Sequence, residues 1–171
     1  QVDAVAVDQP QIYVGEDLDS YSVVGATRSE IDYQGQDGET ESFEYDGADG
    51  VGLSSFVRRA AFALRYRTPN LVISDFLTDE SKIIFNRDIR KRVETLAPFL
   101  RWDDDPYPVV IDGRIVYILV GYTTSNMYPY AQRAESDADR ASGLDHDFNY
   151  VRNSVKAVVD SYDGTVTMYQ T

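Results

Sequence analysis

The sequence contains no cysteine, and this absence excludes disulfide bonds and thiolate metal sites. Long apolar runs are also missing, because no run approaches the roughly 18 to 20 residues that a bilayer-spanning helix requires. The first residues lack the basic, apolar and small-residue pattern of a secretory signal. We therefore expect these 171 residues to be soluble, and their start at Gln1 and stop after a strand-like run predict a fragment of a longer protein.

Basic residues are scarce, with 16 Lys and Arg against 29 Asp and Glu, so the net charge is −13. A protein of this charge is a poor partner for nucleic acid, whose phosphates are neutralised by Lys and Arg. The charge is unevenly distributed. Residues 1–52 carry 13 acids and one base, residues 53–101 carry 5 acids and 10 bases, and residues 102–171 carry 11 acids and 5 bases. The sequence predicts a basic centre between two acidic flanks.

Signatures of catalysis are absent from the sequence as well. His146 is the only histidine, and no G-x-S-x-G motif accompanies it, which argues against a Ser-His-Asp triad. No glycine-rich phosphate loop and no dinucleotide fingerprint occurs. Paired carboxylates suit glycoside hydrolysis, but 29 acids always place some pair at a workable distance. We expect a protein that is not an enzyme and needs no cofactor.

Two β-hairpins are the clearest structural prediction. Apolar runs at 108–111 and 115–120 meet across Asp112-Gly113, and Asp-Gly favours a type I′ turn because both central residues need positive φ. A second hairpin is predicted from 150–159 and 165–169, with Gly164 in the left-handed conformation. Both hairpins indicate antiparallel pairing.

Short strands are predicted near the N-terminus. Two amphipathic helices are predicted between these short strands and the hairpins. The first has Ser54 or Ser55 as a cap and ends at Pro69, and the second starts at Asp79 or Asn86. Each should turn an apolar stripe to the core. The stripe residues are Leu53, Phe56, Val57, Ala60, Ala61 and Leu64 in the first helix, and Phe85, Ile89, Val93, Leu96 and Leu100 in the second.

Strands near both ends with helices between them predict an α+β fold. We expect one domain over residues 1–171, with a mostly antiparallel sheet built from β-hairpins and packed against the two helices. Residues 34–52 are predicted to form a surface loop with room for one strand, because they are dense in Gly, Asp and Glu. Residues 133–148, which are acidic and non-periodic, are predicted to form a second surface loop.

Clustered carboxylates are the candidate metal ligands. Asp103, Asp104 and Asp105 precede a proline-flanked turn, where they could bind a hard cation such as Ca²⁺ or simply cap and shape the turn. We favour the structural role because the spacing of an EF-hand loop is absent. Two D-x-D pairs flank Gly143, and a solvated loop is again the favoured interpretation. These pairs are formed by Asp137, Asp139, Asp145 and Asp147.

Two sets of residues are candidate interaction surfaces. The first is basic and could face anionic lipid headgroups or pair with the chain's own acids: Arg58, Arg59, Arg65, Arg67, Arg87, Arg90, Lys91 and Arg92. The second is aromatic and could form the rim of a peptide or glycan site or cover the core: Tyr107, Tyr122, Tyr128 and Tyr130.

Three stretches carry a family resemblance: GVGLSSFVRRAAFALRYR, RDIRKRVETLAPFLRWDDDPYPVVIDGRIVYILVGYTTSNMYPYAQ and NYVRNSVKAVVDSYDGTVTMY. They resemble the globular region of an uncharacterised family of large bacterial integral membrane proteins. The resemblance implies an extracytoplasmic domain of a multi-pass cell-membrane protein, acting as a binding or scaffold module. Its partners would be the membrane-spanning part of the same polypeptide and an envelope protein or ligand. The alternative is a carboxylate-dependent hydrolase acting on an envelope polymer.

Overall fold

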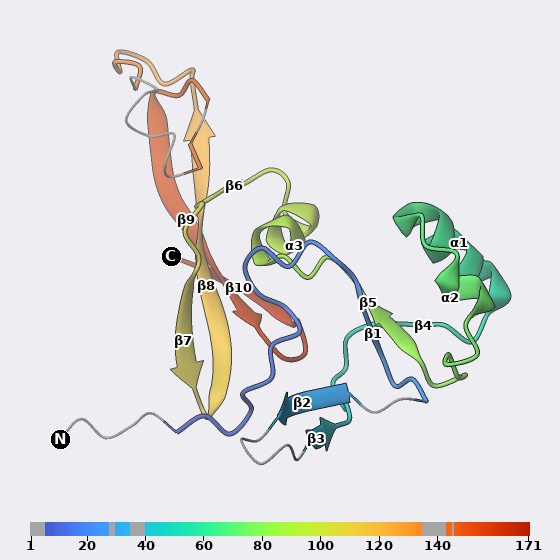
Figure 1. The fold of residues 1–171 in the computed structure, drawn as a ribbon. Helices are drawn as coiled ribbons and strands as arrows, with labels where there is room; N and C mark the ends of the chain where they lie inside the picture. Colours follow the sequence, from blue (N-terminus) through green and yellow to red (C-terminus); the bar gives the residue numbers. More distant parts are fainter. Residues whose placement is uncertain (1–5, 28–29, 35–39, 135–142, 145) are drawn as a thin grey trace. The chain divides into compact units, whose positions relative to one another are not determined.

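The computed structural model describes residues 6–27, 30–34, 40–134, 143–144 and 146–171 (Figure 1). Contacts within the chain divide it into two compact units. The first unit comprises Gln1–Asp19 and Asn86–Thr171, and the second comprises Ser20–Phe85. The second unit is therefore inserted into the sequence of the first, whereas length and composition predict one domain.

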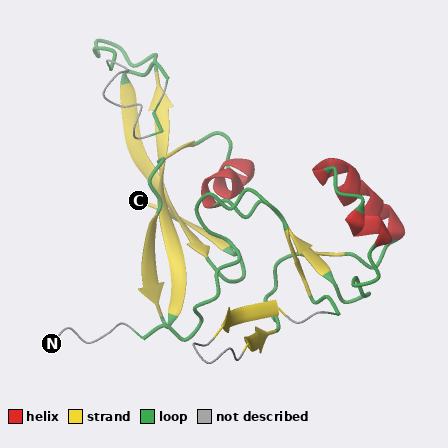
Figure 2. Ribbon diagram, in the orientation of Figure 1, coloured by secondary structure: helices red, strands yellow, loops and turns green. Residues whose placement is uncertain are grey.

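The first unit is built on a five-stranded antiparallel sheet (Figure 2). Its strand order is β10-β9-β8-β6, and β7 also pairs with β8. The long central strand β8 pairs with β9 along nearly its whole length, with a bulge between Gly121 and Tyr122. The strands are β6 (Arg101–Trp102), β7 (Tyr107–Ile111), β8 (Arg114–Ser125), β9 (Tyr150–Asp160) and β10 (Val166–Gln170).

Both predicted hairpins are confirmed. Asp112 and Gly113 connect β7 to β8 with φ of 50° and 75°, as a type I′ turn requires. The Gly113 carbonyl also accepts hydrogen bonds from the backbone N–H of Asp8 (2.8 Å) and Gln9 (3.2 Å). In the turn between β9 and β10, Gly164 has a φ of 66°, so it adopts the predicted left-handed conformation.

The core of the first unit lies between the sheet and helix α3 (Ile89–Leu96). Trp102 is 1% exposed, and its indole N–H donates to the carbonyl of Ala97 at 3.2 Å. A Cβ at Gly121 would lie 2.9 Å from the Trp102 ring, so this position has room for glycine alone. The remaining buried members of the core are Val14, Ile89, Val93, Leu100, Leu119, Ala157 and Val159.

Helix α3 is the second predicted helix, with shifted boundaries and a shorter apolar stripe. Asp88 caps it, because its side chain accepts the Lys91 backbone N–H at 2.8 Å. The predicted start at Asp79 or Asn86 is therefore wrong. Leu96 is also not a core residue, since it is 58% exposed.

The second unit contains two small antiparallel sheets. One has the order β1-β5-β4 and the other pairs β2 with β3. Two strands, β3 and β4, lie between residues 34 and 52, where the sequence predicts a surface loop with room for one strand. The strands are β1 (Ser22–Val24), β2 (Glu30–Gln34), β3 (Thr40–Phe43), β4 (Val51–Gly52) and β5 (Lys82–Ile84).

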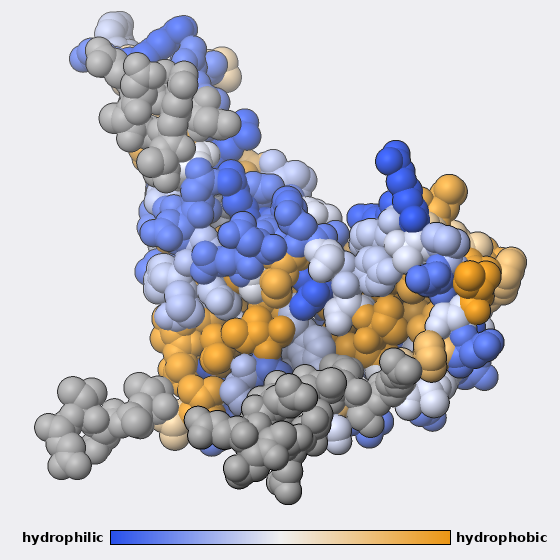
Figure 3. Space-filling view, viewed as in Figure 1, coloured by the Kyte–Doolittle hydropathy of each residue, from blue (hydrophilic) through white to orange (hydrophobic). Residues whose placement is uncertain are grey.

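Helices α1 (Phe56–Tyr66) and α2 (Asn70–Ile73) complete the second unit. The α1 face that packs on the buried residues Leu53, Leu71 and Ile83 carries Phe62, Ala63 and Tyr66. The predicted core-facing stripe is wrong within the helix itself, because its large residues point to solvent. Figure 3 shows hydrophobic residues at the surface in the region that Figure 1 labels α1 and α2. The residues of the predicted stripe that are exposed are Phe56, Val57 and Leu64.

Antiparallel hairpin sheets with packed helices confirm the predicted α+β class. In the predicted loop 133–148, the described residues form neither helix nor strand. Among the helices that the structure describes, none has the length and apolar content needed to span a bilayer.

The turn at Gly113 offers a direct test of the hairpin. We expect Gly113→Ala to lower the free energy of unfolding by about 1–2 kcal/mol, the usual cost of a left-handed conformation for a residue with a Cβ. The new Cβ would also meet the Asp8 side chain. Urea denaturation measures the change. Asp112→Gly is the matched control and should not destabilise the protein, whereas equal stability of Gly113→Ala and wild type would contradict this turn.

Candidate functional site

The far end of the β8–β9 ribbon carries four large surface side chains, which we call the aromatic tip: Met127, Tyr128, Tyr130 and Tyr150. Ser125 pairs with Tyr150 as the last pair of the two strands, and the chain turns beyond it (Figure 1). Met127 is 85% exposed, Tyr128 is 55% exposed and Tyr130 is fully exposed. Side chains of this size are usually covered when they serve packing alone. The tip is therefore a candidate for binding.

Asn149 holds the backbone of the aromatic tip in place. Its side-chain oxygen accepts the Tyr128 N–H at 3.0 Å, and its side-chain nitrogen donates to the Tyr128 carbonyl at 2.8 Å. The Asn149 backbone N–H in turn donates to the Ser125 carbonyl at 2.8 Å. These bonds anchor the loop to the start of β9. A fixed binding surface loses less conformational entropy on association.

The rings of Tyr128 and Tyr150 are stacked, with centroids 5.2 Å apart and an interplanar angle of 14°. The tip thus presents an aromatic platform rather than an enclosed pocket. Rigid aromatic rings with a polar hydroxyl are well suited to contacts with peptide side chains and sugar rings. Such a surface is suited to recognition.

The other two predicted surface tyrosines lie elsewhere in the five-stranded sheet. Tyr107 is the first residue of β7, where it pairs with Ile118 and is 44% exposed. The Tyr122 hydroxyl donates to the Asp103 carboxylate at 3.1 Å. Burial, together with this hydrogen bond, raises the pKa of Tyr122. The sequence analysis did not name Met127, Asn149 or Tyr150 as surface residues. Asn149 and Tyr150 lie some twenty residues after Tyr128 and Tyr130 in the sequence, so no local pattern joins them to these tyrosines.

Of the three aspartates predicted as metal ligands, Asp103 and Asp104 have carboxylates that contact other protein groups. Besides the Tyr122 hydroxyl, the Asp103 carboxylate accepts the Asp105 N–H at 3.1 Å, and Asp104 pairs with Arg90. Within the described ranges, no group of three or more metal-ligating side chains gathers. Calcium binding stays a prediction. Of the D-x-D residues, Asp147 lies 4.0 Å from Arg133, while Asp137, Asp139 and Asp145 lie outside the described residues.

The predicted basic surface is divided between the two units. In the first unit its members have partners: Arg90 forms an ion pair with Glu94 (2.9 Å), and Lys91 forms one with Asp19. Arg87 donates to the Tyr13 carbonyl at 2.7 Å, and Arg92 donates to the Gly164 carbonyl at 2.8 Å. These four side chains support the fold of the first unit.

The α1 arginines of the second unit have no carboxylate partner among the described residues. Arg59 donates to the Leu53 carbonyl at 2.5 Å, and Arg58 reaches the Gly52 carbonyl at 3.4 Å. Arg65 lies over the Tyr66 ring, 5.6 Å from its centroid. Arg67 forms the C-cap of α1 with a φ of 53°. Internal pairing therefore accounts for the basic residues of the first unit and not for those of α1.

A polar cleft of about 410 Å³ lies beside the start of α3. Its carboxylates include Asp88, which caps the helix, and Glu94 and Asp104, which both pair with Arg90. Carboxylates neutralised in this way are poor candidates for a catalytic acid and base. The cleft is lined by Glu16, Asp17, Asp88, Ile89, Arg90, Lys91, Glu94, Asp104 and Pro106. It gives no support to the hydrolase alternative.

His146 contacts a hydroxyl at the same ribbon. Its Nε2 lies 2.8 Å from the Thr124 Oγ1, and its ring centroid is 5.6 Å from that of Phe148. No hydrogen bond in the described part of the chain joins this imidazole to a carboxylate. The arrangement is that of a packing residue and not of a triad base.

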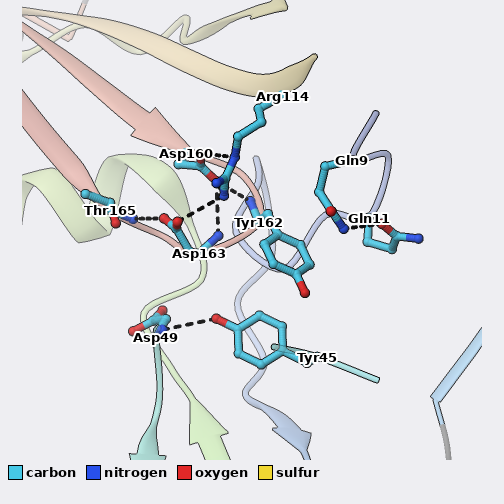
Figure 4. A network of polar contacts seen from close by, with 9 residues as sticks. All are labelled: Gln9, Gln11, Tyr45, Asp49, Arg114, Asp160, Tyr162, Asp163 and Thr165. Carbon is cyan, nitrogen blue, oxygen red and sulfur yellow. Dashed lines mark hydrogen bonds and ion pairs between the residues drawn. The ribbon is translucent and has the colours of Figure 1, made fainter. Parts of the chain in front are cut away.

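A network of charged side chains closes the β9–β10 turn (Figure 4). The guanidinium of Arg114 contacts the carboxylates of Asp160 (2.8 Å) and Asp163 (2.9 Å). Burial alone raises the pKa of Asp163, but hydrogen bonds from Thr165 and the charge of Arg114 outweigh it and lower this pKa below its ordinary value of 3.8. Figure 4 also shows a bond of the second unit, in which the Asp49 N–H donates to the Tyr45 hydroxyl at 3.1 Å.

Fold and site together define a class: an α+β protein of antiparallel hairpins with an exposed aromatic tip. Its family follows from comparison with known sequences. The model of an uncharacterised protein family, UPF0182, matches residues 1–171, and the chain belongs to this family. The family resemblance seen in the sequence motifs is therefore confirmed.

Several relatives carry the same family name. The chain is 41% identical to a UPF0182 protein of Salinispora tropica over 99% of its own length and 19% of the relative. Identity to a protein of Corynebacterium glutamicum strain R is 44%, with 97% of the chain and 18% of the relative covered. Rhodococcus jostii has a relative with 45% identity and the same coverage. The chain thus spans less than a fifth of these curated relatives. No solved structure matches it.

The Arg114 network predicts a pH-dependent contribution to stability. Because the pKa of Asp163 is lowered in the folded state, its stabilising effect is complete above its ordinary pKa and is lost as the pH falls through the folded value. We expect Asp163→Asn to reduce the melting temperature most near about pH 7 and progressively less below about pH 4.

Thermal denaturation across this pH range measures the effect. Asp112→Asn, at an exposed turn carboxylate with a φ of 50°, is the matched control and should show a much smaller change. A melting-temperature deficit of Asp163→Asn that stays constant with pH would contradict the electrostatic role.

Proposed function

We propose that this chain is an extracytoplasmic binding or scaffold module of a multi-pass protein in the bacterial cell membrane. Its partners are the membrane-spanning part of the same polypeptide and a further envelope component. Family membership supports this proposal, and so does the length of the curated relatives, which is about five times that of the chain. The longer relatives have room for membrane-spanning segments outside the matched region.

The observation that carries the binding role is the aromatic tip. Tyr128 and Tyr150 form a stacked pair, and the Asn149 side chain fixes the Tyr128 backbone on both its N–H and its carbonyl. Exposed aromatic rings on a prearranged backbone are typical of surfaces that contribute most of the affinity at an interface. The module therefore recognises a peptide or glycan of the envelope at this end of the ribbon.

Photo-crosslinking in cells tests the binding role. We expect a photoreactive phenylalanine analogue at Tyr130 of the full-length protein to give a discrete adduct, because this side chain is fully exposed and lies two residues after Tyr128 of the stacked pair. The same analogue at Ile111, which is 45% exposed at the opposite end of the ribbon, is the control and should give none.

A second variant separates binding at the tip from accidental proximity. Asn149→Ala removes the side-chain hydrogen bonds to Tyr128 and should weaken the Tyr130 adduct without unfolding the protein. Mass spectrometry identifies the adduct. Equal adducts from Tyr130 and Ile111, or none from Tyr130, would exclude the tip as the binding surface.

The extracytoplasmic location has its own test. The chain contains no cysteine, so a cysteine placed at Asp112 is the only thiol within these 171 residues. We expect a membrane-impermeant maleimide to modify Asp112→Cys in intact cells, because this turn residue is exposed. The full-length protein without the added cysteine gives the background. Labelling that requires cell lysis would place the domain on the cytoplasmic side.

A further inference from the structure

Helix α1 carries two apolar faces, and the structure uses only one of them for its core. Phe62, Ala63 and Tyr66 pack on the buried residues of the second unit. The second face carries large side chains that are exposed: Phe56 by 69%, Val57 by 74% and Leu64 by 83%. Helical spacing places Ala60 and Ala61 between them, so the five residues form one continuous stripe, which we call the outer stripe.

Basic side chains border the outer stripe. Helical spacing places Arg58 and Arg65 along its edge, and Arg67 lies just beyond the last turn. Within the described residues, none of these three forms an ion pair. No Asp or Glu occurs between residues 51 and 74, although the whole chain has a net charge of −13. The surface around α1 is therefore locally cationic and apolar in an otherwise acidic protein.

We propose that α1 docks on a membrane surface that contains anionic lipids. The outer stripe enters the boundary between headgroups and acyl chains, and the arginines contact lipid phosphates. This combination of Phe and Leu on one side and Arg at the border is typical of helices that lie in the plane of a membrane interface. The inference goes beyond the proposed function, because it concerns a different unit of the chain and a different ligand chemistry from those of the aromatic tip.

Charge favours a bilayer over a second copy of this chain as the occupant of the stripe. In an antiparallel pairing of two outer stripes, Arg58 and Arg65 of one copy would lie along the same edge as Arg58 and Arg65 of the other copy. No acidic residue between 51 and 74 is there to neutralise them. Like charges at a closed interface are unfavourable, whereas lipid phosphates supply the missing negative charge.

Vesicle flotation of the 171-residue chain tests this proposal. We expect the protein to float with vesicles of phosphatidylglycerol and phosphatidylcholine, and not with vesicles of phosphatidylcholine alone. Binding should weaken with added salt, because the arginine contacts are screened. Arg58→Gln together with Arg65→Gln should lower the partition coefficient by about fivefold for each charge removed.

The outer stripe is tested by Leu64→Glu, which should abolish flotation. Phe99→Glu is the matched control, because Phe99 is also apolar and 81% exposed but belongs to the first unit and to neither proposed surface. It should float like the wild type. Melting temperatures of Leu64→Glu and the wild type should agree, since Leu64 is 83% exposed. A marked fall would show that the stripe is covered within the protein, and would overturn the proposal.

Two further outcomes also overturn it. The first is failure of the wild type to float with either type of vesicle. The second is a dimer of the wild type in analytical ultracentrifugation that Leu64→Glu dissociates, which would assign the stripe to self-association. Neither result affects crosslinking from Tyr130, so failure of this proposal is distinguishable from failure of the proposed function.

Discussion

The packing of Trp102 on Gly121 is the constraint on which the first unit depends. The indole lies against the central strand β8 at a position where a Cβ would be 2.9 Å from its ring. Its N–H is satisfied by the Ala97 carbonyl just after α3, so one side chain joins helix, short strand and central strand. A Cβ at Gly143 would also lie 2.2 Å from the Trp102 carbonyl oxygen. The Trp102 ring can lie on β8, and the loop at residue 143 can approach the Trp102 backbone, only because glycine occupies these two positions.

Local turn chemistry could be read from the sequence, because few conformations satisfy it. Asp112-Gly113 and Gly164 require positive φ, and the structure has it at all three residues. The amphipathic period of α1 was also readable, but periodicity does not say which of two apolar faces meets the core. Phe62 and Tyr66 face the core because their rings contact those of Phe85 and Tyr21, and these contacts depend on tertiary structure. The outward direction of Phe56 and Leu64 could not be predicted for this reason.

The candidate site was predicted only in part. Tyr128 and Tyr130 were named as aromatic surface residues, and both are exposed. Asn149 and Tyr150, the partners of Tyr128, are brought to it by the pairing of β8 with β9, and no local signal marks a contact over that sequence distance. The basic residues show the same limit. Composition showed a cationic centre. Only the fold shows that Arg90 and Lys91 form ion pairs with acidic residues, whereas Arg58 and Arg65 form none with the residues that the structure describes.

The two backbone segments that flank the second unit in the sequence are paired with each other in the first unit. Gly15 and Asp88 form a parallel bridge, in which the Gly15 N–H donates to the Arg87 carbonyl (3.0 Å) and the Ile89 N–H to the Gly15 carbonyl (3.2 Å). The segments where the chain leaves and re-enters the first unit are therefore neighbours that are hydrogen-bonded to each other. A unit inserted between two adjacent segments of this kind can be exchanged, lengthened or lost while the first unit keeps its own hydrogen bonds. The sequences of the first unit and of the inserted second unit can thus diversify independently within one polypeptide.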